Sequence, residues 1–159
     1  MIAEKRLLGY CGMYCGNCMG KTGVIADAAR DFLDVLDKYE FEKTANRVFS
    51  EQLSGYDDLI DMLMFMENLR CNRLCREIDG GESKCIVREC CVENGYFACN
   101  SCENFEDCDK LKMILGRLHF EACRRNLRDV NEIGLEKWLA EGTKHHYWDR
   151  DIKEQEVND

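Results

Sequence analysis

The sequence predicts a mainly α-helical protein in which an irregular, cysteine-rich segment is inserted between helices. Proline is absent from the 159 residues, and proline is the residue that most strongly breaks a helix. Apolar residues recur with helical spacing through several segments. That spacing is lost between residues 71 and 108, where eight of the 12 cysteines lie. Hydrophobic content of 45% and charged content of 33% suit one small domain with a polar surface.

The first three cysteines, Cys11, Cys15 and Cys18, lie in residues 9–20, which we expect to form a tight loop. Glycines at positions 12 and 16 stand between these cysteines, and each would weaken a helix by roughly 1 kcal/mol. A loop of this kind turns its sulfur atoms and backbone amides inward.

Three helices are predicted between the two groups of cysteines. Residues 22–40 form an amphipathic pattern, with apolar side chains on one face and charged ones between them. A shorter helix over residues 45–53 stops at a Ser-Gly pair. The third helix begins near Asp57 or Asp58, because acidic side chains favour a helix N-terminus, and it runs into Cys71.

Helix is predicted again after the cysteine-rich segment, over residues 109–128 and 131–141. Leu111, Leu115 and Ala122 lie on one face of the first of these. We expect residues 1–148 to form a single helical domain in which the two cysteine clusters, 11–18 and 71–108, pack together. Residues 149–159 are polar and are expected to fray.

The N-terminal residues and the hydropathy of the chain predict a cytoplasmic protein. The first ten residues include an acidic side chain and no apolar core of a signal peptide. No run approaches the ~20 apolar residues that a membrane-spanning helix needs. The formal net charge is −9, and nucleic-acid affinity rests on Lys and Arg contacts to phosphate. A nucleic-acid partner and membrane insertion are therefore not expected, whereas a protein partner is compatible with the sequence.

The cysteine spacings predict metal binding. A reducing cytosol keeps thiols free, and clustered cysteines there usually bind metal. Several pairs stand two to five residues apart, close enough to approach one ion from the same side. These pairs are Cys11/Cys15, Cys15/Cys18, Cys71/Cys75, Cys85/Cys90, Cys99/Cys102 and Cys102/Cys108. Zinc and iron–sulfur clusters both take thiolate ligands, so both remain open.

The N-terminal cluster supplies only three thiols. A closed tetrahedral zinc site needs a fourth, which the second cluster would have to provide. The spacing Cys11-x3-Cys15-x2-Cys18 is also the one that radical S-adenosylmethionine enzymes use for a [4Fe–4S] cluster. Those enzymes place it in a large α/β barrel, and this short chain shows no alternating strand and helix pattern.

Two blocks of sequence, residues 10–18 and residues 85–111, contain most of the clustered cysteines. On these blocks the chain resembles an uncharacterised prokaryotic family of small cysteine-rich proteins, a domain of unknown function thought to bind zinc. Members often carry proline after the third cysteine and before the last, where this chain has Met19 and Asp107. The resemblance implies ten candidate ligands, leaves Cys91 and Cys123 outside the pattern, and implies no established activity. It rests on Tyr10-Cys11-Gly12-Met13-Tyr14-Cys15-Gly16-Asn17-Cys18, and on Cys85-Ile86-Val87-Arg88-Glu89-Cys90, Gly95, Cys99-Asn100-Ser101-Cys102, Phe105, Cys108 and Leu111.

These observations predict a small zinc-binding protein in which the metal is mainly structural. The expected role is accessory or interaction, without catalysis, and the alternative is an iron–sulfur protein with a redox or anaerobic-enzyme accessory role. One closed site is expected from Cys85, Cys90, Cys99, Cys102 and Cys108. A second is expected from Cys11, Cys15 and Cys18 with Cys71 or Cys75. His119, His145 and His146 are interpreted as surface or hydrogen-bonded side chains.

Overall fold

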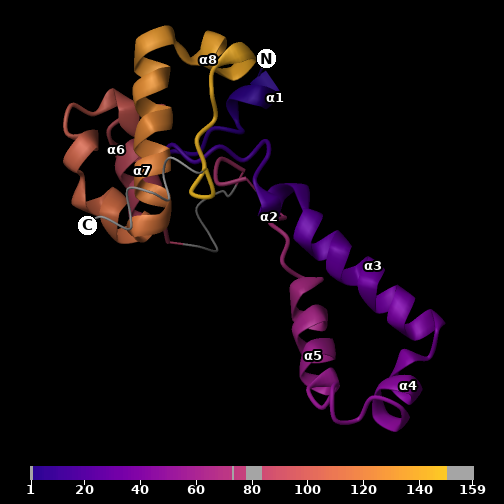
Figure 1. Cartoon of the computed structure of the whole chain (residues 1–159). Coiled ribbons are helices and arrows are strands. Elements are labelled where there is room, and N and C mark those ends of the chain that lie inside the picture. Colours follow the sequence, from indigo (N-terminus) through magenta and orange to yellow (C-terminus); the bar gives the residue numbers. More distant parts are fainter. Residues whose placement is uncertain (1, 73, 78–83, 150–159) are drawn as a thin grey trace. The chain divides into compact units, whose positions relative to one another are not determined.

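The computed structural model describes residues 2–72, 74–77 and 84–149 (Figure 1). This part of the chain holds eight α-helices and two short 3₁₀ helices, and its extended structure is limited to one isolated antiparallel bridge between Leu8 and Tyr14. The predicted mainly α fold is confirmed. The chain divides into two compact units: unit 1 comprises residues 1–16 and 73–159, and unit 2 comprises residues 17–72.

Unit 2 contains four helices: α2 (Met19–Thr22), α3 (Val24–Lys38), α4 (Phe41–Arg47) and α5 (Tyr56–Met66). Helices α3 and α5 pack against each other, and α4 packs on α3. Their apolar faces enclose one core, in which the rings of Phe41 and Tyr56 lie 6.0 Å apart. The buried members of this core are Ala29, Leu36, Ala45, Tyr56 and Leu63.

Helix α4 differs from the predicted helix over residues 45–53. It begins at Phe41, directly after Glu40, whose positive φ of 45° ends the preceding helix. Residues 48–55 form turns instead of helix. The side chains of Val48 and Phe49 are 66% and 44% exposed, so little packing is available to hold a longer helix here.

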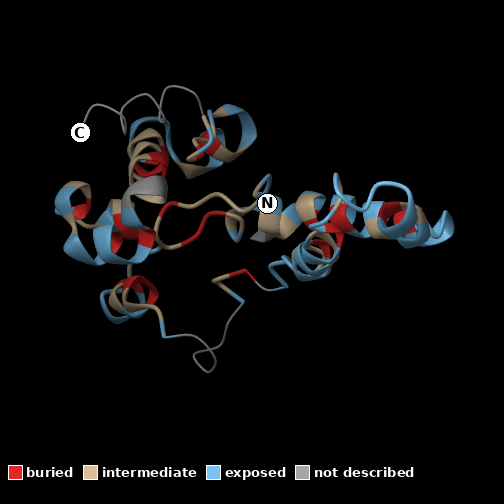
Figure 2. Ribbon diagram, turned by 60° about the horizontal axis from the view of Figure 1, so that its bottom comes forward, coloured by how far each residue is buried: buried red, intermediate tan, exposed pale blue. Residues whose placement is uncertain are grey.

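Unit 1 is built around α7 (Asp109–Ile133), which contains one non-helical residue, Gly116. Helix α6 (Ile86–Glu93) and the 3₁₀ helices η1 (Cys99–Ser101) and η2 (Phe105–Asp107) pack against it. The core between these elements contains three cysteines among its buried side chains (Figure 2). Its members are Val87, Cys91, Ala98, Cys99, Phe105, Leu111, Leu115, Cys123 and Leu127.

A second cluster of unit 1 lies at the C-terminal end of α7. Helices α1 (Ile2–Lys5) and α8 (Leu135–Glu141) pack against each other there, and α8 also packs on α7. Leu8, Val130 and Trp138 are the buried side chains. Helix α7 therefore continues five residues beyond the predicted end at 128 and stops at Gly134, where a φ of 83° suits glycine.

The predicted domain boundaries stay a prediction. A division into compact units describes contacts and does not decide whether residues 1–148 fold as one domain. Of the predicted frayed tail, residues 149–159, all but Asp149 lie outside the described residues.

Candidate metal centre

The N-terminal cysteines of unit 1 lie in a tight loop, as the glycines predicted. The Gly9 amide donates a 2.8 Å hydrogen bond to the carbonyl of Met13, and the Cys15 amide donates a 2.7 Å bond to the carbonyl of Leu7. These bonds reverse the chain direction between Cys11 and Cys15. This reversal places the backbone of Gly12 directly against α7.

Gly12 brings this loop against α7. Its φ is +93°, and a Cβ atom there would lie 2.5 Å from the backbone oxygen of Cys123. Glycine is needed at this position for both reasons, since other side chains rarely adopt this φ and none fits the space. Asn126 fixes the same contact, because its side-chain nitrogen donates a 3.0 Å hydrogen bond to the Gly12 carbonyl.

Cys11 and Cys123 are consequently in contact, although 112 residues separate them. The buried Cys123 thiol forms a side-chain hydrogen bond with the Cys11 sulfur and lowers the pKa of Cys11 to about 7. The same hydrogen bond raises the pKa of Cys123. The geometry thus favours a thiolate at Cys11, the form of cysteine that binds metal.

Cys75 lies on another side of the same loop. A Cβ atom on Gly9 would be 3.5 Å from the sulfur of Cys75 and 3.7 Å from that of Cys11. Both sulfurs therefore flank one glycine. Cys75 is one of the two residues predicted to supply the fourth thiol of the N-terminal site.

Arg76 ties this loop to the second cysteine cluster. Its guanidinium donates 2.6 Å hydrogen bonds to the carbonyls of Leu8 and Phe97, and it stacks on the rings of Tyr10 and Phe97. The backbone adds a 2.9 Å bond from the Cys99 amide to the Tyr10 carbonyl. Within unit 1, the segments that carry Cys11, Cys75 and Cys99 are therefore neighbours.

A second pair of thiols lies between α6 and η1. The sulfurs of Cys91 and Cys99 are 3.6 Å apart, and both residues are buried. Their hydrogen bond lowers the pKa of Cys91 and raises that of Cys99. Next to them, Cys90 accepts a hydrogen bond from Lys110, which raises the pKa of Lys110, and Cys108 adds a smaller contribution.

Unit 2 holds a third pair, Cys18 and Cys71. The Cys71 amide donates a 2.8 Å hydrogen bond to the carbonyl of Gly20. A Cβ atom on Gly20 would lie 3.9 Å from the Cys18 sulfur and 3.8 Å from the Cys71 Cβ. The exposed Cys71 also lines an apolar cavity of about 520 Å³ beside Met19 and Leu69. The pair is accessible from solution.

All 12 cysteines are reduced in the structure. Among the described residues, no three His, Cys, Asp or Glu side chains form a group that could hold a metal ion as they stand. The thiols come together in pairs, so a site with four thiolates requires side chains to move when metal binds. The donor chemistry itself suits zinc or an iron–sulfur cluster.

Two of the residues in these contacts were not among the ten predicted ligands. Cys91 and Cys123 were left out because they fall outside the spacing pattern, yet each forms a hydrogen bond with a predicted ligand. The position of Cys123 on the apolar face of the predicted helix 109–128 was the available signal. No contact of this kind is described for Cys85 or Cys102.

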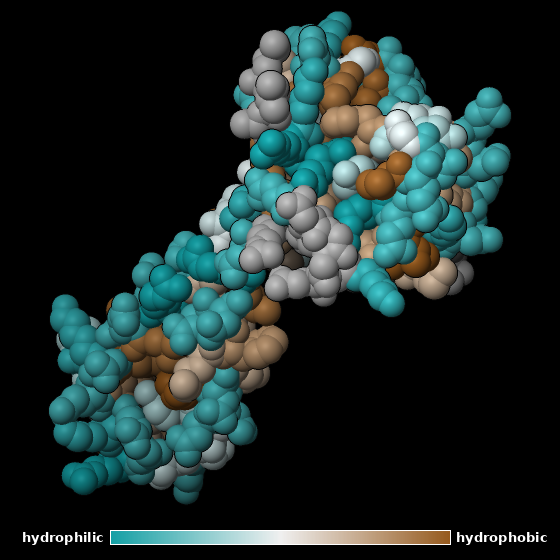
Figure 3. All heavy atoms as spheres, turned by 180° about the vertical axis from the view of Figure 1, so that it is seen from behind, coloured by the Kyte–Doolittle hydropathy of each residue, from teal (hydrophilic) through white to brown (hydrophobic). Residues whose placement is uncertain are grey.

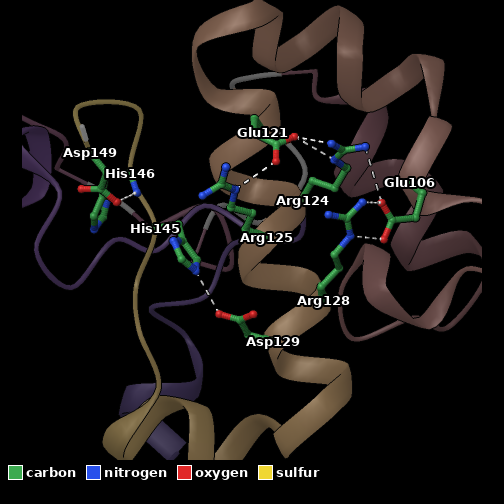
Figure 4. A network of polar contacts seen from close by, with 9 residues as sticks. All are labelled: Glu106, Glu121, Arg124, Arg125, Arg128, Asp129, His145, His146 and Asp149. Atoms are coloured by element: carbon green, nitrogen blue, oxygen red, sulfur yellow. Dashed lines mark hydrogen bonds and ion pairs between the residues drawn. The ribbon is translucent and has the colours of Figure 1, made fainter. Parts of the chain in front are cut away.

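Three arginines of α7, Arg124, Arg125 and Arg128, are engaged in ion pairs (Figure 4). Arg128 and Arg124 converge on Glu106, and Arg124 and Arg125 both pair with Glu121. Hydrogen bonding to Arg128 holds the pKa of Glu106 below its usual range. This network joins η2 to α7 and leaves little free positive charge for an anionic ligand.

The histidines fasten the segment after α8 to α7. His145 is 3.0 Å from a carboxylate oxygen of Asp129 (Figure 4). The backbone of His145 also donates to and accepts from the side chain of Asn126. His146 is buried and stacks on Trp148 with ring centres 4.2 Å apart. The interpretation as a surface or hydrogen-bonded side chain therefore holds for His145. It was wrong for His146, whose ring is buried and whose Nε2 has no hydrogen-bond partner among the described residues.

Comparison with known protein families gives a match. Residues 7–113, more than half of the chain, match the family model described as a protein of unknown function (DUF3795). No curated protein and no solved structure matches the chain. None of the helices in the described ranges is both long and apolar enough to cross a membrane.

Proposed function

We propose that this chain, which belongs to the DUF3795 family, is a small zinc-binding protein whose metal is mainly structural. The observation that carries the proposal is the contact between Cys11 and Cys123. It joins two distant segments through a pair of thiols and lowers the pKa of Cys11 to about 7. A thiol that ionises this readily is prepared for a metal ion.

The ten predicted ligands divide between the two units. In unit 1, Cys11 and Cys15 lie in the N-terminal loop with Cys75 beside it, and five cysteines surround α6, η1 and η2. In unit 2, Cys18 and Cys71 form a pair of their own. Zinc, when bound, would supply cross-links between thiolates of segments that lie far apart in the sequence. The five predicted ligands in or beside α6, η1 and η2 are Cys85, Cys90, Cys99, Cys102 and Cys108.

The role that follows is accessory or interaction, in the cytoplasm, without chemistry of its own. The polar side chains around the thiols serve to build the fold: Arg76 bonds backbone carbonyls, and Lys110 bonds Cys90. Neither presents a free acid or base beside a thiol. A scaffold in which metal fixes the backbone is the simplest use of this arrangement.

An iron–sulfur cluster is the second candidate, because cysteine thiolates are ligands for iron–sulfur clusters as well as for zinc. Elemental analysis of anaerobically purified protein separates the two. We expect a colourless protein that contains zinc. A brown protein with iron and acid-labile sulfide would replace the zinc proposal with the iron–sulfur one.

Adjacent cysteines in α6 provide a matched pair of variants. Cys90 belongs to the predicted ligands, whereas Cys91 does not. Cys90→Ser should lower the zinc content per folded chain, and Cys91→Ser should retain it. Equal zinc content in both variants and the wild type would remove Cys90 from the ligand set.

A further inference from the structure

Unit 2 contains a pocket that takes no part in the proposed metal chemistry. It has a volume of about 720 Å³ and is lined by residues of α3, α4 and α5 and by Glu40 between α3 and α4. This volume falls within the range of small-molecule sites, roughly 300–1,000 Å³. None of its lining residues is a cysteine.

The lining is strongly acidic. Six carboxylates and one lysine contribute to it, and that lysine, Lys43, already pairs with Glu40. The other five carboxylates have no ion-pair partner anywhere in the described part of the chain. These are Asp34, Asp37, Glu42, Asp57 and Asp61. Together these charges give the pocket a negative potential, which favours a cationic ligand.

The floor of the pocket is apolar and aromatic. Leu33, Leu36 and Ile60 contribute aliphatic surface, and Phe41 and Tyr56 contribute rings. Figure 3 shows brown apolar surface bordered by teal hydrophilic surface on the part of the molecule that contains these helices. A ligand that fits must therefore combine positive charge with apolar length.

Tyr56 adds an independent sign of a ligand. Tyr56 lines the pocket and is only 7% exposed to solvent. Its hydroxyl has no hydrogen-bond partner among the described residues, yet it is not one of the fully buried unpaired atoms. Burial raises the pKa of Tyr56, and the charges of Glu42 and Asp57 add to this shift. Both of these carboxylates also line the pocket, so the Tyr56 hydroxyl lies near its acidic lining. It can bond a ligand there.

The carboxylates are spread over three helices, and no group of three in the described chain could hold a metal ion. A single small ion therefore fits the pocket poorly. An aliphatic chain with ammonium groups at intervals matches the separated carboxylates, and its methylenes match the floor. We propose that unit 2 binds a free aliphatic polyamine in this pocket.

Calorimetric titration of the full-length protein with spermidine at low ionic strength tests the proposal. Spermidine should bind at one site, putrescine should bind less tightly, and butylamine, with one charge, should bind least. Asp57→Asn should weaken spermidine binding up to about fivefold, the usual effect of one exposed charge pair. Tyr56→Phe, which keeps the ring, should also weaken it.

Asp58→Asn is the matched control, since it removes the same charge from the same turn of α5 outside the pocket lining. Asp34→Asn is the second variant, and circular dichroism verifies the folding of each. Equal loss in the Asp57 and Asp58 variants would overturn the proposal, as would binding of butylamine as tight as that of spermidine. Tighter binding of magnesium, or of an oligolysine peptide of equal charge, would also overturn it.

Discussion

The side-chain nitrogen of Asn126 donates a 3.0 Å hydrogen bond to the backbone carbonyl of Gly12 and so holds the first cysteine loop on α7. The same side chain donates to the carbonyl of His145 and accepts from its amide at 2.8 Å. Asn126 is fully buried. One amide therefore joins a loop near the N-terminus, α7 and the segment that follows α8.

Replacement of Asn126 should be costly for that reason. Asn126→Ala removes three hydrogen bonds and leaves backbone groups of the buried Gly12 and the half-buried His145 unpaired. We expect the free energy of unfolding to fall by about 3 kcal/mol. Urea denaturation measures it, with Asn131→Ala as a control. Asn131 is exposed and bonds Asn100, so its loss should cost about 1 kcal/mol or less; similar costs would contradict the role assigned to Asn126.

Gly12 provides a second stability test with an internal control. Gly12→Ala combines a positive φ with a Cβ atom 2.5 Å from the Cys123 oxygen, whereas Gly95, with φ +67°, has open space around it. Gly95→Ala should cost only the backbone term, about 1–2 kcal/mol. Gly12→Ala should cost at least ~1 kcal/mol more, since the loop must also move away from α7. Thermal unfolding of both variants measures the difference. Equal losses of stability would show that the loop can move away from α7 without a further loss of stability.

Removal of metal should unfold the cysteine-rich part of the chain. Structural zinc contributes on the order of 10 kcal/mol to folding in small thiolate sites. Exhaustive chelation should therefore reduce the helical circular-dichroism signal, with α6 and the loop at residues 9–18 affected first. The core of unit 2 contains no cysteine and should keep part of the signal. An unchanged spectrum after verified metal loss would exclude a structural role for the metal.

Acid should weaken the attachment of the C-terminal segment. Burial lowers the pKa of His146, and the carboxylate of Asp149 opposes only part of that shift. Below pH ~6.5 the unfolded chain then takes up a proton before the folded one does. The contribution of neutral His146 to the free energy of unfolding is fully present above that pH. It declines as the pH falls toward the folded-state pKa, by up to about 1.4 kcal/mol per pH unit.

The variant His146→Phe keeps a ring against Trp148 and removes the titration. Its urea midpoint should change less between pH 7.5 and about pH 5.5 than that of the wild type. His119, whose pKa burial also lowers, should retain a share of the pH dependence. Identical pH profiles for variant and wild type would contradict the assignment to His146.

The sequence pattern predicted the helices that carry an apolar stripe. It was least accurate where tertiary contacts determine the end of a helix or bring distant residues together. Helices α3 and α7 fall close to the predicted ranges because their apolar residues recur on one face. Helix α5 ends at Met66, so the prediction that it runs into Cys71 was wrong. The predicted helix end at residue 53 was wrong, because Val48 and Phe49 are apolar residues that the fold leaves exposed. Spacing along the chain cannot reveal a contact such as Cys11 with Cys123, which depends on how α7 packs on a loop 112 residues away.

Unit 2 begins after Gly16 and ends before Arg73, so it interrupts unit 1 as an insertion in the chain. The contacts of Cys11 with Cys123, of Cys91 with Cys99, and of Asn126 with Gly12 all lie outside it. Insertions, deletions or substitutions within unit 2 can therefore leave those contacts intact. The insertion also contains Cys18 and Cys71, so the sequence of its helices α3, α4 and α5 can change independently of the predicted ligands while those two cysteines are kept.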